Sequence, residues 1–182
     1  KSPPTTPTQF QEMACKAKNS PFSERTGADS VGYMLSLDAS RFASWVFAFG
    51  GTLYDDTAKA YVLDSEEAVN AMTFLQALFK LGCAEVVEER FGDQSKFGDG
   101  ELLFALASSS GMPFFGNAVD SGANFQWRVN SLAHTTDMPV VNQFGASISM
   151  PKHNKKSELA SWLFLKYFTS PSVQGDWVRA TN

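Results

Sequence analysis

One stretch of the chain restricts the fold more than any other: an apolar run that stops abruptly at small polar residues. The run covers Leu102–Ala107, three serines follow at Ser108–Ser110, and helix-forming residues come after Gly111. This pattern predicts a buried strand that turns directly into a helix. Free N–H groups at the start of such a helix, with Phe114 and Phe115 beside them, suit the rim of a small-molecule site. A packed serine-rich turn without a ligand explains the same residues equally well.

Two further segments have the same character. Ser36–Phe42 follows a strand-like run and opens a helix that Asp38 or Ser40 caps, and Phe144–Ser147 begins a strand after a polar run. In α/β proteins, ligands bind outside the carboxyl ends of the strands. Because two of the three segments lie at such ends, the pattern favours a binding site.

The remaining periodicity predicts alternating helices and strands, which together indicate a mixed α/β fold. The first helix begins with a capping box formed by Thr6 and Gln9. The helix that opens at Asp64–Glu67 is predicted to bury one face, which consists of Val69, Met72, Leu75 and Phe79. Strands are predicted at residues 31–37, 102–107, 125–132 and 145–150, with a small hairpin over residues 53–62. Helices are predicted at residues 7–19, 40–49, 65–81, 111–119 and 157–168, and from residue 171 onwards.

The composition excludes several classes of partner. The 182 residues include 15 Lys and Arg against 19 Asp and Glu, and the basic residues are scattered, so we expect no nucleic-acid binding. No apolar run approaches the roughly 20 residues that span a bilayer. The first residues do not resemble a secretory leader. Either a leader was removed, or the protein is cytosolic, or the chain is part of a longer one.

The residues that most often bind metals show no suitable spacing. Cys15, Cys83, His134 and His153 match no zinc or redox pattern, so we expect no metal site and no cofactor. Cys15 lies in a helical pattern, where packing as a small apolar side chain is the simplest role. A disulfide between the two cysteines is the alternative.

Residue types used in catalysis occur without the motifs that normally accompany them. Ser109 or Ser110 with His134 and Asp137 would supply a catalytic triad, but no Gly-x-Ser-x-Gly elbow surrounds the serines. Ser149–Lys152 spells a Ser-x-x-Lys pattern, but a proline at its third position opposes the helical turn that this chemistry requires. We therefore expect a binding protein and not an enzyme. A small serine hydrolase using Ser109 or Ser110, and a standalone interaction domain, are the alternatives.

Seven segments follow one another in the order and spacing of a known family. They are Pro4–Phe10, Gly32–Leu35, Phe49–Gly51, Leu63–Ala68, Phe97–Glu101, Gly145–Ser147 and Trp162–Pro171. Together they cover nearly the whole chain, which resembles the extracellular solute-binding proteins of ABC importers, in the group of the maltose- and glycerol-3-phosphate-binding proteins. One departure is Pro7, which stands where the family pattern usually has tryptophan.

The resemblance implies an incomplete α/β protein of the type II periplasmic-binding-protein fold. Residues 1–141 would form the C-terminal lobe, and residues 142–182 a crossover strand and helices that return to the N-terminal lobe, whose remainder and membrane anchor would lie outside this chain. Such a protein binds a carbohydrate or a polyol phosphate in the periplasm or outside the cell and delivers it to ABC-transporter permease subunits. A fragment of this kind would expose apolar faces of its last helices and self-associate.

The strand-end argument and the resemblance together predict a ligand rim. Its members are Asp38, Ser40, Arg41, Trp45, Ser109, Ser110, Gly111, Met112, Phe115, Gly145 and Ala146. The resemblance implies ligand contacts for the Ser109–Gly111 turn and for Gly145 with Ala146, and it puts Phe115 near the stacking aromatic of sugar binders. Asp38 and Arg41 stand in a segment that often contains tryptophan in the family.

Overall fold

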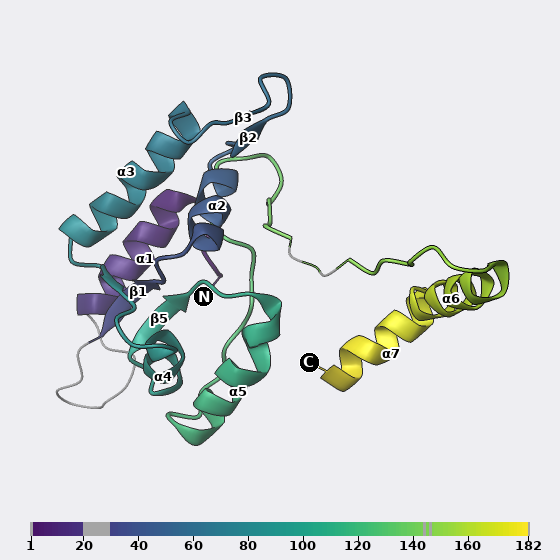
Figure 1. The fold of residues 1–182 in the computed structure, drawn as a ribbon. Coiled ribbons are helices and arrows are strands. Elements are labelled where there is room, and N and C mark those ends of the chain that lie inside the picture. Colours follow the sequence, from purple (N-terminus) through teal and green to yellow (C-terminus); the bar gives the residue numbers. More distant parts are fainter. Residues whose placement is uncertain (1, 20–29, 144, 146, 182) are drawn as a thin grey trace. The chain divides into compact units, whose positions relative to one another are not determined.

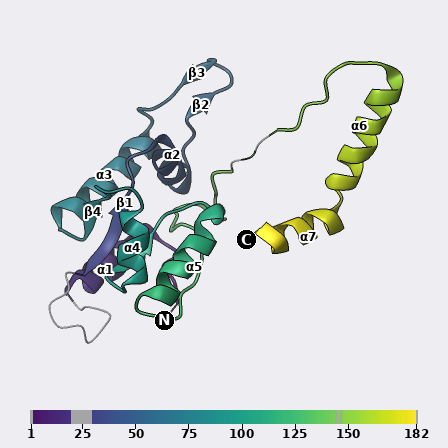
Figure 2. The same cartoon turned by 60° about the horizontal axis from the view of Figure 1, so that its bottom comes forward.

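A computed structural model describes residues 2–19, 30–143, 145 and 147–181. The chain divides into two compact units, Lys1–Asn142 and Gln143–Asn182, which are described separately here. Figure 1 labels most elements of the two units, and Figure 2 also labels β4. The α/β class predicted from the sequence is confirmed.

A parallel sheet organises the first unit. Its strands are β4 (Ala84–Val86), β1 (Val31–Leu35) and β5 (Leu102–Ala105), in that order across the sheet. The central strand β1 is buried along its whole length, and its Tyr33 is in register with residues of both neighbours. Because all three strands are parallel, the loops that follow them leave the sheet at one common edge. A separate antiparallel hairpin joins β2 (Tyr54–Asp55) to β3 (Ala60–Tyr61), as predicted.

Helices cover both faces of this sheet. Three of them, α1 (Pro7–Asn19), α2 (Ala39–Ala48) and α3 (Glu66–Lys80), contribute to one hydrophobic cluster with β1. On the other face lie α4 (Gly92–Gly98) and α5 (Met112–Ser121), the latter preceded by the 3₁₀ turn η1 (Ser109–Gly111). Figure 1 shows α1 beside α3, and α4 beside α5. The five helices place apolar side chains on the sheet from both sides.

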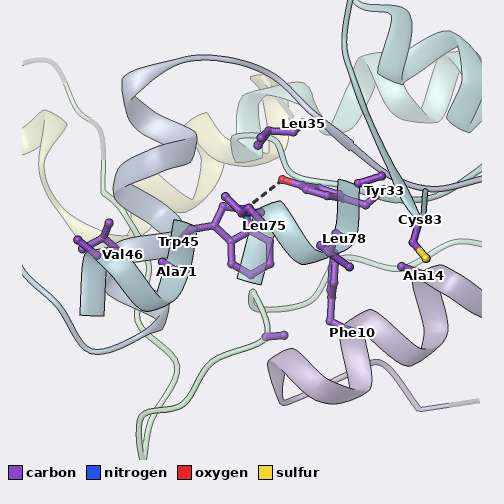
Figure 3. Close-up of a cluster of buried hydrophobic side chains, with 13 residues drawn as sticks. Phe10, Ala14, Tyr33, Leu35, Trp45, Val46, Ala71, Leu75, Leu78 and Cys83 are labelled. Carbon is purple, nitrogen blue, oxygen red and sulfur yellow. Dashed lines mark hydrogen bonds between the residues drawn. The ribbon is translucent and has the colours of Figure 1, made fainter. Parts of the chain in front are cut away.

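The first cluster is built around aromatic rings (Figure 3). Phe10 of α1 stacks on Phe104 of β5 with ring centroids 4.5 Å apart. The Trp45 indole N–H of α2 donates a hydrogen bond of 3.1 Å to the Tyr33 hydroxyl of β1. Burial raises the pKa of the Tyr33 phenol, so this group stays neutral and keeps its hydrogen-bonding role. These contacts fix α1 and α2 to the centre of the sheet.

The second cluster lies on the opposite face. Its buried members are Val31, Met34, Phe97, Leu102, Phe115 and Val119. Phe97 of α4 contacts Phe115 of α5 edge to face, with centroids 5.4 Å apart. Phe115 is thereby held by packing at the start of α5, close to the edge from which the strand-end loops depart.

A disulfide joins α1 to the residue just before β4. It links Cys15 to Cys83, whose Cα atoms are 4.7 Å apart, within the usual range for such bonds. Cys15 packs against the first cluster as the helical pattern predicted, and the disulfide alternative holds as well. Sequence spacing could not reveal it, because the close approach of α1 and β4 depends on tertiary packing.

The helix ends follow the capping pattern of the sequence. Thr6 Oγ1 accepts a hydrogen bond from the Gln9 N–H, and Gln9 Oε1 accepts one from the Thr6 N–H, which confirms the predicted capping box. Asp38 is the N-cap of α2, and Ser65 is the N-cap of α3. Local signals therefore set where these helices begin.

Two predicted strands are not formed. Residues 125–132 do not form a strand, because their backbone has no ladder partner among the described residues. The rings of Phe125 and Trp127 instead pack against Phe97. Gly145 and residues 147–150 form no strand either, and these residues are exposed. Alternating apolar residues need a neighbouring strand to become a sheet. Phe144 and Ala146 lie outside the described residues.

The second unit contains α6 (Lys155–Phe168) and α7 (Pro171–Thr181), which Figure 2 shows as consecutive helices joined at a bend. Phe168 contacts Trp177 edge to face at 5.6 Å, and its carbonyl accepts a hydrogen bond from the Gln174 side chain. Neither helix has a buried residue. In the part of the chain that the structure describes, no helix has the length and apolar character needed to cross a membrane.

Candidate ligand-binding site

The loops that follow the three parallel strands meet around one hollow of about 520 Å³. Ser36 and Leu37 come from the loop after β1, and Val87–Phe91 come from the loop after β4. The segment after β5 contributes Ala107, Ser108, Ser110 and Gly111. Residues from the first turns of α2, α4 and α5 complete the lining, and they are Arg41, Asp93, Gln94, Phe114 and Phe115. We refer to this cavity as the strand-end hollow.

Arg41 is held in place by groups from two of these loops. Asp38 caps α2 by accepting hydrogen bonds from the N–H groups of Ser40 (2.9 Å) and Arg41 (3.0 Å) at its Oδ1. Its Oδ2 lies 3.4 Å from Arg41 Nη1, and Arg41 Nε donates to the Leu106 carbonyl at 3.1 Å. The guanidinium group therefore connects the loop after β1 to the segment after β5 while it lines the hollow.

The loop after β4 carries an unusual backbone conformation. Phe91 has φ of 64°, in the left-handed region that non-glycine residues rarely adopt. Its ring is 53% exposed, and the guanidinium carbon of Arg90 lies 4.8 Å from the ring centroid. Such strain persists only where the surrounding structure enforces it, and it is commonest at functional positions. Here it presents a flat aromatic ring at the rim of the strand-end hollow.

The serine-rich turn after β5 supplies the third side. Ser108 Oγ and Ser110 Oγ are hydrogen-bonded at 2.7 Å, and the backbone makes the single 3₁₀ turn η1 before α5 starts. Ser110 and Gly111 line the strand-end hollow, and Phe114 beside them is 62% exposed. Phe115, in contrast, is buried in the second cluster and shows only part of its ring.

Asp93 lines the candidate site and was not predicted from the sequence. It lies in the first turn of α4, lines the hollow and is only 8% exposed. Glu88 and Glu89 line the same hollow from the preceding loop. The strand-end rule could have identified these residues, but β4 has only three residues and its sequence includes a glutamate, so the pattern did not indicate a strand.

The structure brings four of the predicted rim residues to this hollow: Arg41, Ser110, Gly111 and Phe115. Ser109 and Met112 line a second cavity of about 280 Å³ beside β5. It shares Ala107, Ser108 and Phe115 with the strand-end hollow, and residues 103–106 and 127–133 form much of the rest of its lining.

The other predicted rim residues lie elsewhere. Asp38 and Ser40 belong to the start of α2, where the Ser40 carbonyl accepts a hydrogen bond from Asn142. Trp45 is completely buried in the first cluster. Gly145 belongs to the second unit, and Ala146 lies outside the described residues.

The groups proposed for a triad have other partners. Ser110 is hydrogen-bonded to Ser108, and His134 Nδ1 is hydrogen-bonded to Thr136. Within the described ranges no hydrogen bond joins a serine to a histidine. His134 lines a different cavity, beside the start of α1. The same part of the chain contains no group of three or more His, Cys, Asp or Glu side chains arranged to hold a metal ion.

Comparison with known proteins assigns the chain to a family. The family model described as "Bacterial extracellular solute-binding protein" matches residues 1–182. No curated protein gives a significant match to the chain. The Cys15–Cys83 disulfide suits an oxidising location outside the cytoplasm, where such bonds persist. The parallel sheet, its strand-end hollow and the family match over the full length lead to one conclusion: the chain belongs to the bacterial extracellular solute-binding proteins, of the type that serves ABC importers.

Proposed function

We propose that the strand-end hollow binds a small polyhydroxylated solute, a carbohydrate or a polyol phosphate, for delivery to an ABC-transporter permease. The observation that carries the proposal is the convergence of the loops after all three parallel strands on one hollow. Members of the family generally bind solutes without catalysis. The polar groups in this hollow accordingly serve recognition in the proposal, and no reaction step is assigned to them.

The aromatic rings at the rim favour a solute with both apolar and polar faces. Phe91 and Phe114 are each more than half exposed, although phenylalanine is normally buried. A sugar ring presents C–H groups on one face and hydroxyls at its edge. The faces of the two rings would contact the C–H groups, while Arg41 and the Ser110 hydroxyl would bind the hydroxyls.

The first unit acts as one lobe of a binder in this proposal. Residues 1–141 form the lobe, residues 142–182 belong to the crossover and the second lobe, and the boundary between the compact units after Asn142 supports this division. Attachment to a membrane through an N-terminal anchor rests on the family resemblance alone. With the contacts of one lobe only, we expect millimolar affinity, which corresponds to about 4 kcal/mol of binding free energy.

Self-association of the chain is a further part of the proposal. The apolar residues Trp162, Phe164 and Trp177 are each more than half exposed, and α6 and α7 contain no buried residue. Exposed apolar faces of this kind favour contacts between copies. Sedimentation velocity should show a weight-average mass that rises with protein concentration, and a constant monomer mass would contradict this part.

A nuclear magnetic resonance titration tests the binding site directly. Adding neutral sugars and polyol phosphates to the ¹⁵N-labelled chain should shift amides of residues 36–41, 87–94 and 107–111 and leave those of α3 unchanged. Replacing Phe114→Ala should weaken binding about tenfold, because one aromatic contact is lost. Leu81→Ala is the matched control, since Leu81 is similarly exposed (56%) and does not line the hollow. The proposal is wrong if no solute shifts these amides, or if the two variants bind equally.

A further inference from the structure

We infer that Asp93 selects neutral polyhydroxylated solutes and rejects phosphorylated ones. The inference rests on the proposed function, because it assumes that a solute occupies the strand-end hollow. It decides between the carbohydrate and the polyol phosphate that the proposal leaves open.

The environment of the Asp93 carboxylate points to a ligand. Its side chain is more than nine-tenths buried, and among the residues that the structure describes it forms no hydrogen bond and no ion pair. In the same part of the chain, every side-chain nitrogen or oxygen atom that is fully buried has a hydrogen-bond partner. The Asp93 oxygens are therefore not sealed in the protein, and they reach the hollow that the residue lines. Donors for this carboxylate must come from that hollow, as water or as the hydroxyls of a solute, because an unpaired buried charge is costly.

The charges around the hollow make it unfavourable for an anion. Three carboxylates line it, from Glu88, Glu89 and Asp93, against the two guanidinium groups of Arg41 and Arg90. The Arg41 charge is also partly compensated, because Nη1 lies 3.4 Å from an oxygen of Asp38. A phosphate would bring up to two further negative charges next to a poorly hydrated carboxylate, where repulsion is strong.

A neutral hydroxyl fits the same groups better. A hydroxyl can donate its proton to the Asp93 carboxylate and accept a hydrogen bond from a guanidinium N–H at the same time. Arg41 uses Nε for the Leu106 carbonyl and faces Asp38 with Nη1, so Nη2 has no hydrogen-bond or ion-pair partner among the described residues. A polyhydroxylated ring offers several hydroxyls of this kind, whereas the ionised phosphate group of a phosphomonoester offers acceptors and no more than one donor.

Matched pairs of probes test the inference. The probes are glucose with glucose 6-phosphate, glycerol with glycerol 3-phosphate, and inorganic phosphate alone, each titrated into the full chain and followed by amide shifts. The wild-type chain should bind the neutral member of a pair more tightly. Asp93→Asn keeps the size of the side chain and removes its charge, so it should weaken binding of the neutral member about tenfold and strengthen binding of the phosphorylated member.

Two further variants complete the design. Asp120→Asn is the control, because Asp120 is exposed on α5 and does not line the hollow. A Glu88→Gln, Glu89→Gln double variant lowers the negative charge at exposed positions, and it should improve phosphate binding even if Asp93→Asn fails to fold. The inference is wrong if the wild-type chain binds the phosphorylated probe more tightly, or if Asp93→Asn leaves the preference unchanged. The proposed function would stand in either case. A chain that binds neither member of any pair overturns the proposed function, and the inference with it.

Discussion

At the scale of single residues, Gly32 determines how closely α1 can approach the sheet. A Cβ atom at this position would lie 2.2 Å from the carbonyl oxygen of Ala14 and 2.7 Å from its Cα. The obstacle is helix backbone, so no side-chain rotation can relieve the contact. The absence of a side chain in the middle of β1 therefore allows Phe10 and Ala14 to pack against Tyr33 in the first cluster.

We predict that Gly32→Ala destabilises the protein by about 3 kcal/mol or more, because α1 must move away from β1. Gly116→Ala is the control: its Cβ would meet only the Trp127 ring at an ordinary 3.8 Å, and alanine favours the helix by roughly 0.5–1 kcal/mol. Urea unfolding followed by circular dichroism compares the two variants. Equal midpoints would contradict the close contact between α1 and β1.

At the scale of elements, α3 shows how close packing changes which face of a helix is buried. The expected stripe included Val69 and Met72, but these side chains are 52% and 47% exposed, and Leu75 is the expected member that is buried. The buried face consists of Ala68, Ala71, Leu75 and Leu78. The two alanines on that face let α3 lie close to its neighbours. The sequence prediction chose the larger apolar side chains, which in three of four cases are the next residue in the chain.

Two truncations on α3 distinguish its observed buried face from the predicted one. Leu78→Ala should lower the free energy of unfolding by about 2–5 kcal/mol, because Leu78 is completely buried. Met72→Ala should lower it by less than about 1 kcal/mol, since half of that side chain already contacts water. Thermal unfolding of both variants provides the measurement. A larger loss for Met72→Ala would mean that the predicted face, and not the observed one, is buried.

The elements differ in how far the sequence determined them. Capping groups and glycines identified α1, α2, α3 and the strand–turn–helix at β5, because those signals act within a few residues. The pattern at residues 125–132 was misleading, since aromatic packing onto Phe97 and strand pairing both produce alternating apolar residues. In the candidate site, Arg41 and Ser110 followed from strand ends. Asp93 and Phe91 could not be predicted in this way. They follow the short strand β4, which the sequence pattern does not indicate and which forms only by pairing with β1.

At the scale of the whole molecule, the disulfide is the main covalent constraint between distant parts of the first unit. Cys15 and Cys83 are 68 residues apart in the sequence, so the bond closes a large loop in the unfolded chain. Both hydrophobic clusters are built from residues of this unit, and the disulfide connects two elements of the first cluster. The covalent link and the core therefore stabilise the same body.

Removal of the disulfide should lower the stability of the chain without unfolding it at room temperature. For a loop of this length we expect a loss of about 2–4 kcal/mol, or roughly 10 °C in the unfolding midpoint. Scanning calorimetry with and without a reducing agent measures the effect. A Cys15→Ala, Cys83→Ala double variant is the control and should not respond to the reductant. An unchanged midpoint for the reduced wild-type chain would contradict the prediction.

The position of that bond has a consequence for how such a protein can acquire new ligands. Cys83 lies at the amino end of β4, whereas Val87–Phe91 and the other loops of the strand-end hollow lie beyond the carboxyl ends, about 10 Å further along the sheet. Mutations in these loops leave the covalent link and the first cluster intact. Under the proposed function, changes in a few loop residues would therefore alter solute preference while the scaffold stays constant. The same separation makes the loops after β1, β4 and β5 suitable for randomisation in a library of engineered biosensors.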